Sequence, residues 1–299
     1  MQVDQLQTLV AVLDAGTFDA AASRLHVTAS AVSQRIRALE QSAGRVLVRR
    51  TTPITLTAAG DIVLRYARQI ELLEADASRA LQLESMDGGA ARVSIAVNAD
   101  SLSTWFLGAL VGLGPQLGAA FEIHREDQER TATLLRAGVV MAAVTATADA
   151  VQGCSTHPLG VMRYHAVCSA EFRARYLPAD DALAALRSAP IVQFDRNDDL
   201  QDAFLRRNSP SGSAGPRHLI PTSDDFARAV KQGFGWGMLP EQQCASELEA
   251  GTLVDLAPSQ VTDVPLYWQR WNLDSSLLDG VTDAVVETAR TALQPFVHR

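Results

Sequence analysis

A short segment, residues 28–37, carries side chains that can read the edges of DNA bases. An amide side chain can bond adenine through two hydrogen bonds, and guanidinium groups hold backbone phosphates. We therefore expect Ser33 and Gln34 to contact bases, and Arg35 and Arg37 to contact phosphates. A β-hairpin that follows should bring one or two more arginines to the phosphates. The full candidate set for DNA contact is Thr28, Ser30, Ser33, Gln34, Arg35, Arg37, Arg49 and Arg50.

The surrounding residues predict that this segment is the second helix of a helix-turn-helix. Apolar residues recur at helical spacing within residues 6–13, 18–25 and 32–39. Gly16 ends the first helix, and Thr17 and Thr28 cap the second and third. The apolar side of the third helix is then buried, its polar side faces outward, and such a helix lies in the major groove. Residues 46–56 read as the two strands of a wing.

A long helix is predicted from Thr57 to about residue 84. It carries apolar residues at alternating steps of three and four, the pattern of a seam against a partner helix. The alternative is that this helix packs only on its own domain. A partner helix from a second copy would give a dimer, which matches an inverted repeat in DNA. The seam residues are Val63, Tyr66, Ile70, Leu73 and Ala77.

Residues 86–89 read as a linker, and beyond them strands alternate with helices. This alternation predicts parallel sheets with flanking helices, in two lobes with a ligand cleft at the carboxyl ends of the strands. The overall class is therefore α/β, with an all-α winged helix-turn-helix and a long linker helix before a two-lobed domain. We expect a DNA-binding domain at 1–58, a linker helix at 59–87 and an effector domain at 91–299. Its first lobe covers 91–162 and 267–299, and its second covers 163–266.

Motifs for catalysis and cofactor binding are missing from the sequence. It has no GxxxxGK[ST], GxSxG or HExxH motif, and no GxGxxG follows a predicted strand. The glycines of residues 233–237 are followed by Leu239 and Pro240 rather than by a helix that could bind phosphate, so they indicate a tight turn into a buried strand. The six histidines are scattered, and the three cysteines lack the spacing of a zinc site or a disulfide framework. We therefore expect no catalytic residue, no metal and no cofactor.

Composition and charge point to a cytoplasmic protein with no membrane segment. The chain has 299 residues, of which 47% are hydrophobic, and contains no apolar run of about 18 residues. Its start lacks the pattern of a secretory signal. The net charge is −8, yet residues 1–58 carry six arginines against four acidic residues. A mildly basic N-terminal domain followed by an acidic one fits DNA binding at the N-terminus.

Three stretches at fixed spacing, residues 17–25, 28–40 and 56–60, closely resemble the LysR-type transcriptional regulators. Residues 233–240 look like a glycine-rich turn and strand of the same family. Residues 96–105, 126–128, 192–195 and 266–268 resemble its ArgP/LysG branch. Val48 and Pro53 depart from the usual wing, which puts single wing contacts in question. The resemblance implies a homodimer or dimer of dimers on double-stranded operator DNA, contact with RNA polymerase, and control of a basic-amino-acid exporter gene.

This branch responds to lysine and arginine, so the resemblance implies L-lysine or L-arginine as effector. Such a ligand needs hydroxyl and amide groups for its carboxylate, and carboxylates for its two cations. Polar residues of both kinds follow the predicted strands, with Asp127 and Asp195 favoured for the cations and Ser101 and Thr104 for the carboxylate. The candidate effector residues are Asn98, Ser101, Ser103, Thr104, Glu126, Asp127, Thr145, Asp195, Thr222 and Asp224.

Three alternatives stay open at this point. The chain could be a LysR-type regulator with a different small-molecule effector. It could be a solute-binding protein, whose two-lobed fold the C-terminal part resembles, although the missing signal peptide argues against this. It could also be an enzyme with an appended DNA-binding module, which the absence of a catalytic set disfavours.

Overall fold

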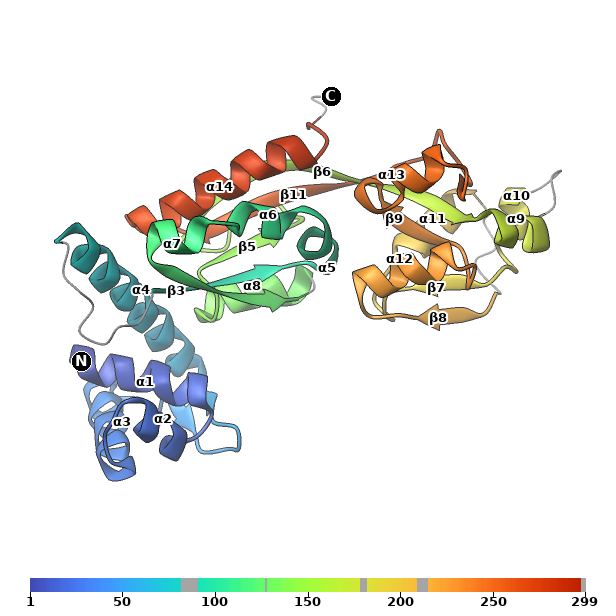
Figure 1. Cartoon of the computed structure of the whole chain (residues 1–299). Helices are drawn as coiled ribbons and strands as arrows, with labels where there is room; N and C mark the ends of the chain where they lie inside the picture. The colour runs from blue at the N-terminus through green and yellow to red at the C-terminus, as the bar shows by residue number, and fades with distance from the viewer. Residues whose placement is uncertain (82–90, 127, 178–181, 209–214, 297–299) are drawn as a thin grey trace. The chain divides into compact units, whose positions relative to one another are not determined.

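The computed structural model describes residues 1–81, 91–126, 128–177, 182–208 and 215–296 (Figure 1). The chain forms two compact units. The first consists of Met1–Val97, Leu110–His157 and Trp268–Ala284, and the second of Asn98–Ala109, Pro158–Tyr267 and Val285–Arg299. The predicted linker at residues 86–89 lies outside the described residues.

The N-terminal part of the first unit is the predicted winged helix-turn-helix. Thr17 and Thr28 cap α2 and α3 as predicted, because each side chain accepts a hydrogen bond from a backbone N–H three residues on. The three helices close on an apolar core that includes Leu9, Ile36 and Leu39. The elements are α1 (Val3–Ala15), α2 (Phe18–Arg24), α3 (Ala29–Ala43), β1 (Val48–Arg49) and β2 (Thr55–Leu56).

The linker helix α4 (Ala58–Ala80) begins at Thr57, whose side chain accepts from the Gly60 N–H. Leu64, Ala67 and Leu72 of α4 are buried. The predicted seam is divided between the two sides of the helix, since Val63 and Ile70 pack partly on the winged-helix core. The large apolar residues that stay exposed are Ile62, Tyr66 and Leu73 on α4 and Leu81 just after it, and Ala77 of the predicted seam is exposed as well.

The rest of the first unit is built on a parallel sheet, as predicted. Its central strand β3 (Ala91–Val97) pairs with β4 (Ala119–Arg125) from Ala91↔Ala119 to Val97↔Arg125, and with β5 (Ala142–Thr145) at Ile95↔Ala142. Helices α7 (Leu113–Leu117) and α8 (Gln128–Ala137) connect these strands. Leu135 and Val140 pack with β3 and β5 residues in one apolar core.

The second unit corrects the expectation of parallel sheets throughout. Its long strand β6 (Cys154–Ser169) pairs antiparallel with β9 (Gly237–Pro240) and with β10 (Leu253–Asp255). Parallel pairing also occurs there, between β7 (Ile191–Gln193) and β8 (Arg217–Leu219) and in the single bridge from Ile191 to Trp236. Helices of this unit are α9 (Ala170–Tyr176), α10 (Ala182–Ala185), α11 (Leu200–Asn208), α12 (Ser223–Lys231) and α13 (Glu241–Glu249).

Residues 98–110 form a helical stretch of three parts rather than one continuous α-helix. It is divided into α5 (Ala99–Ser101), the π-helical turn η1 (Leu102–Phe106) and α6 (Leu107–Leu110). Most of this stretch belongs to the second unit, whereas the sequence assigned it to the first lobe. The last strand β11 (Thr262–Trp271) and the last helix α14 (Ser276–Ala292) contribute residues to both units.

Candidate DNA-contacting surface and effector site

The outward face of α3 carries the predicted base-reading side chains. Burial of Val32, Ile36 and Leu39 in the winged-helix core directs the opposite side of the helix to solvent. Gln34 is exposed and Ser33 is half-buried. At the start of the helix, Thr28 and Ser30 are exposed and bond each other at 3.0 Å. This face therefore offers an amide and hydroxyls on a capped, fixed helix.

The four candidate arginines differ in how free they are to meet phosphates. Arg37 and Arg49 are exposed. Arg35 is half-buried and turns toward α1, where its Nε lies 3.6 Å from an Asp4 carboxylate oxygen. Arg50 is exposed at the wing, and its guanidinium lies 5.6 Å from the centre of the Phe18 ring. Phosphate contact by Arg35 would thus compete with an existing ion pair.

A network of hydrogen bonds in the second unit joins four distant segments of the chain. Tyr164 on β6 donates to one carboxylate oxygen of Asp100, and Ser223 at the start of α12 donates to the other, both at 2.7 Å. The Gln243 amide on α13 donates to Ser223 at 2.9 Å and to Ser103 at 3.2 Å. Ser103 in turn donates to Asp224. We call these six residues the Asp100 network: Asp100, Ser103, Tyr164, Ser223, Asp224 and Gln243.

The carboxylates of the Asp100 network have no cationic partner among the described residues. Neither Asp100 nor Asp224 makes an ion pair there, and the donors to Asp100 are neutral hydroxyls. Burial, followed by the nearby Asp100 charge, raises the pKa of Tyr164 well above its usual value. Burial also raises the pKa of Asp198, to which the Asp100 charge contributes. The local field is therefore negative and favours a bound cation.

Two buried polar atoms next to Asp100 in sequence lack a hydrogen-bond partner within the described structure. These are Oδ1 of Asn98 and Oγ of Ser101, and Ser101 is fully buried. Buried polar atoms are nearly always bonded, so such atoms call for a ligand or water. The adjoining π-helical turn at Leu102–Phe106 is a feature that recurs at functional sites.

Of the predicted effector residues, the structure brings Ser103 and Asp224 together. Thr104 donates to the Asp100 carbonyl inside its own helix, and Thr222 donates to Asp225. Asp195 accepts from the N–H groups of residues 197 and 198 and so closes its own turn. Asp100, Tyr164, Ser223 and Gln243 were absent from the predicted set. Only the position of Asp100 after a strand, between two predicted residues, could have signalled it.

Glu126 and Thr145, two further predicted effector residues, lie in the first unit. Glu126 follows β4 and forms an ion pair with Arg130 at 3.4 Å. Thr145 ends β5, is almost fully buried, and accepts from the Gln269 amide at 3.2 Å. Asp127 lies outside the described residues.

Metal-site and membrane-span geometry are both missing from the part of the chain that the structure describes. No three His, Cys, Asp or Glu side chains there are grouped so as to hold a metal ion. No helix among the same residues has the length and apolar character needed to cross a membrane.

Two family profiles match the chain. The one described as bacterial regulatory helix-turn-helix protein, lysR family, matches residues 3–61, and the LysR substrate binding domain matches residues 87–290. The HTH-type transcriptional regulator LysG of Mycobacterium tuberculosis is 46% identical over 285 residues, covering 94% of this chain and 91% of that protein. The lysine export transcriptional regulatory protein LysG of Corynebacterium glutamicum is 40% identical, covering 97% and 99%.

Solved structures agree with these matches. The crystal structure of ArgP from Mycobacterium tuberculosis has a TM-score of 0.85 at 44% identity and covers 98% of both chains. The full-length LysG of Corynebacterium glutamicum with bound effector Arg has a TM-score of 0.79 at 38% identity, covering 99% of this chain and 100% of that one.

Proposed function

Because this chain belongs to the LysR family of bacterial helix-turn-helix regulators, we propose that it controls transcription in response to a basic amino acid, L-lysine or L-arginine. The similar lysine export regulators and the arginine-bound LysG structure support this effector class. By the same reasoning, the regulated gene encodes an exporter of basic amino acids. The protein acts by binding, and no catalytic step is part of the proposal.

The observation that carries the effector proposal is the unpaired carboxylate of Asp100. Asp100 is half-buried and accepts hydrogen bonds from two neutral hydroxyls, so it can still pair with a cation, and a basic amino acid supplies two cations. Asp100 and Asp224 would accept the α-ammonium and the side-chain cation, and Oδ1 of Asn98 adds a neutral acceptor. The unpartnered Ser101 hydroxyl would donate to the ligand carboxylate. The contributions predicted for Thr104, Glu126, Asp127, Thr145, Asp195 and Thr222 stay predictions.

Calorimetric titration of the full-length protein with arginine, lysine and histidine tests this assignment. Asp100→Asn removes one charge-assisted contact of about 1.5–3 kcal/mol, so affinity for the basic ligand should fall about 10–100-fold. Asp263→Asn is a matched control, because Asp263 loses an equal charge in the same unit but pairs with Arg163 at 2.9 Å. Absence of binding by the parent, or unchanged binding by both Asp100→Asn and Asp224→Asn, would overturn the assignment.

The DNA-bound form proposed here is a homodimer on an inverted repeat, with α3 in the major groove. Ser33 and Gln34 would read bases, with Thr28 and Ser30 at the helix start. Arg37, Arg49 and Arg50 would hold phosphates, and Arg35 would do so only by releasing Asp4. A mobility shift on DNA upstream of the gene tests the proposal. Loss of the shift when an excess of unrelated DNA is added would contradict sequence-specific binding.

The second copy is proposed to dock on the exposed apolar side of α4. Ile62, Tyr66, Leu73 and Leu81 recur there at helical spacing, and an identical helix offers the same stripe in return. Assembly into a dimer of dimers, contact with RNA polymerase and a cytoplasmic location complete the proposal, since a regulator of transcription must meet chromosomal DNA and the polymerase.

A further inference from the structure

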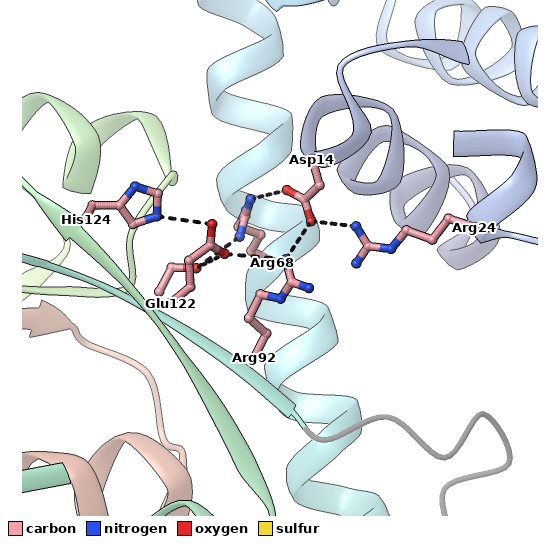
Figure 2. Close-up of polar contacts among 7 residues, drawn as sticks. Asp14, Arg24, Arg68, Arg92, Glu122 and His124 are labelled. Atoms are coloured by element: carbon pink, nitrogen blue, oxygen red, sulfur yellow. Dashed lines mark hydrogen bonds and ion pairs between the residues drawn. The ribbon is translucent and has the colours of Figure 1, made fainter. Parts of the chain in front are cut away.

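A cluster of charged side chains within the first unit connects the winged helix to the effector domain (Figure 2). Asp14 at the end of α1 is the carboxylate that the arginines of the cluster share on the winged-helix side. Three arginines surround Asp14: Arg24 from α2 at 3.1 Å, Arg68 from α4 at 2.8 Å and Arg92 from β3 at 3.6 Å. We call Asp14, these arginines, Ser94 and Glu122 the Asp14 cluster.

Arg68 is the central member of the cluster and holds both domains at once. Its side chain is almost fully buried, and its Nη2 donates to Asp14. Its Nη1 lies 3.5 Å from the hydroxyl of Ser94 on β3, which donates onward to Glu122 on β4 at 3.4 Å. A linker-helix side chain is therefore bonded to α1 on one side and to the effector-domain sheet on the other, as Figure 2 shows.

Arg92 provides a second, direct link between the domains. Its Nη1 lies 3.6 Å from Asp14 and 3.4 Å from Glu122, so a single guanidinium bridges one carboxylate of each domain. His124, two residues further along β4, extends the cluster with Nε2 at 3.6 Å from Glu122. Arg92 and Glu122 are each nearly half exposed, so their pairing by itself adds little stability.

The electrostatic energy of the cluster depends on how the winged helix and the effector domain are placed relative to each other. Asp14 is shared among three arginines and forms an ion pair with the buried guanidinium of Arg68, and Glu71 on the same helix also interacts with the Arg68 and Asp14 charges. Separation of the two domains would leave Arg68 without its Ser94 acceptor and Asp14 without Arg92, whereas Glu122 would keep its contacts with Arg92 and Ser94 inside the effector domain. Clusters of this kind add little net stability but penalise any displaced geometry strongly.

The strand that carries Arg92 and Ser94 leads directly into the candidate effector residues. β3 ends at Val97, and Asn98, Asp100 and Ser101 follow it. From Ser94 to Asn98 the strand spans about 13 Å, at about 3.3 Å per residue. A bound effector that displaces the end of β3 therefore displaces the same strand that carries Arg92 and Ser94 of the cluster.

We propose that the Asp14 cluster is a latch that fixes the DNA-binding domain and linker helix on the effector domain of the same subunit, and through which effector binding alters DNA affinity. The relay to the effector rests on the function proposed above. Coupling between two sites needs an element that both sites bias, and the latch joined to β3 is that element.

The test is a pair of measurements on the full-length protein. The first measures operator affinity by fluorescence anisotropy, with and without saturating arginine, in the parent and in an R92Q/S94A variant. Both substitutions lie in the effector domain, outside the DNA-contacting and effector-contacting sets. We expect arginine affinity and arginine-free operator affinity to stay within twofold of the parent. The arginine effect is the ratio of operator affinity with arginine to operator affinity without it. In the variant this ratio should lie at least threefold closer to one than in the parent.

Arg163→Gln is the matched control, because it breaks an arginine–aspartate pair in the second unit and should leave the arginine effect unchanged. The second measurement needs no effector. Melting of the parent, Asp14→Asn, Arg92→Gln and the double variant forms a thermodynamic cycle, in which we expect non-additive effects.

Additive effects in the cycle would overturn the link between the domains. A non-additive cycle with an unchanged arginine effect would overturn the relay. Failure of the parent to bind arginine or lysine in calorimetry would count against the proposed function alone, because the cycle would still decide whether the latch exists.

Discussion

Replacement of Gly60 by alanine should disturb the packing of the first turn of the linker helix against the wing. A Cβ at Gly60 would lie 2.1 Å from the carbonyl oxygen of Leu47 and 3.1 Å from the Cβ of Leu56. The first turn of α4 would have to move by about 1 Å, and overpacking of this kind costs about 1–3 kcal/mol. The move also strains the 2.9 Å hydrogen bond from the Thr57 N–H to Leu47, worth about 1 kcal/mol.

The better helix propensity of alanine offsets at most about 1 kcal/mol of that cost. We therefore expect Gly60→Ala to destabilise the winged-helix domain by about 2 kcal/mol, and to lower its melting temperature by about 8 °C or more. The assay is thermal unfolding of the full-length protein followed by circular dichroism, together with operator affinity. Gly108→Ala is the matched control, because its nearest atom would lie 3.9 Å away and no loss is expected. Equal melting temperatures for parent and Gly60→Ala would refute the reasoning.

Three further predictions concern α3, the pH dependence of stability and self-association. Gln34→Ala should cost about 1–3 kcal/mol of operator affinity and relax specificity at one base pair. The control Gln242→Ala, in the second unit, should change neither. Equal effects of the two substitutions in a mobility shift would contradict base reading by Gln34. Burial raises the pKa of Glu71 from 4.5 to about 7, so the folded state binds this proton more tightly and stability is lost as pH rises from about 4.5 through 7. The free energy of unfolding of Glu71→Gln should therefore rise relative to that of the parent between pH 5 and pH 8, by no more than about 3 kcal/mol. Urea unfolding at several pH values measures this difference, and a difference that does not change with pH would contradict the prediction. Tyr66→Asp places a charge on the exposed stripe of α4 and should weaken the dimer in sedimentation velocity, whereas Phe234→Asp in the second unit should not.

The linker helix α4 illustrates why a tertiary contact overrides a periodicity. Apolar residues line two sides of this helix, so the spacing alone does not say which side packs inside the subunit. Leu64 and Ala67 fit the winged-helix core, and Val63 and Ile70 are drawn partly toward it. The exposed stripe therefore centres on Ile62 and Tyr66. An aspartate at Ile70, one of the seam residues predicted from the sequence, would also disturb the core.

The sequence by itself determined the winged helix, because its signals are local. Helical spacing of apolar residues and side-chain caps act within a few residues, and the structure confirms the caps predicted at Thr17 and Thr28 and shows a third at Thr57. The alternation of strands and helices likewise indicated the parallel sheet around β3. It failed for β6, β9 and β10, since strand direction depends on where the chain returns, and that information is not local.

Only the tertiary structure decided which polar side chains meet. Asp100 lies 64 residues from Tyr164 and 123 from Ser223, so no spacing in the sequence links them. Asp195, favoured from its place after a strand, instead closes its own turn. The same holds for Asp14 and Arg92, which meet because α4 packs on the sheet of its own subunit. Long-range polar contacts follow from packing of the apolar faces, and packing is a property of the whole fold.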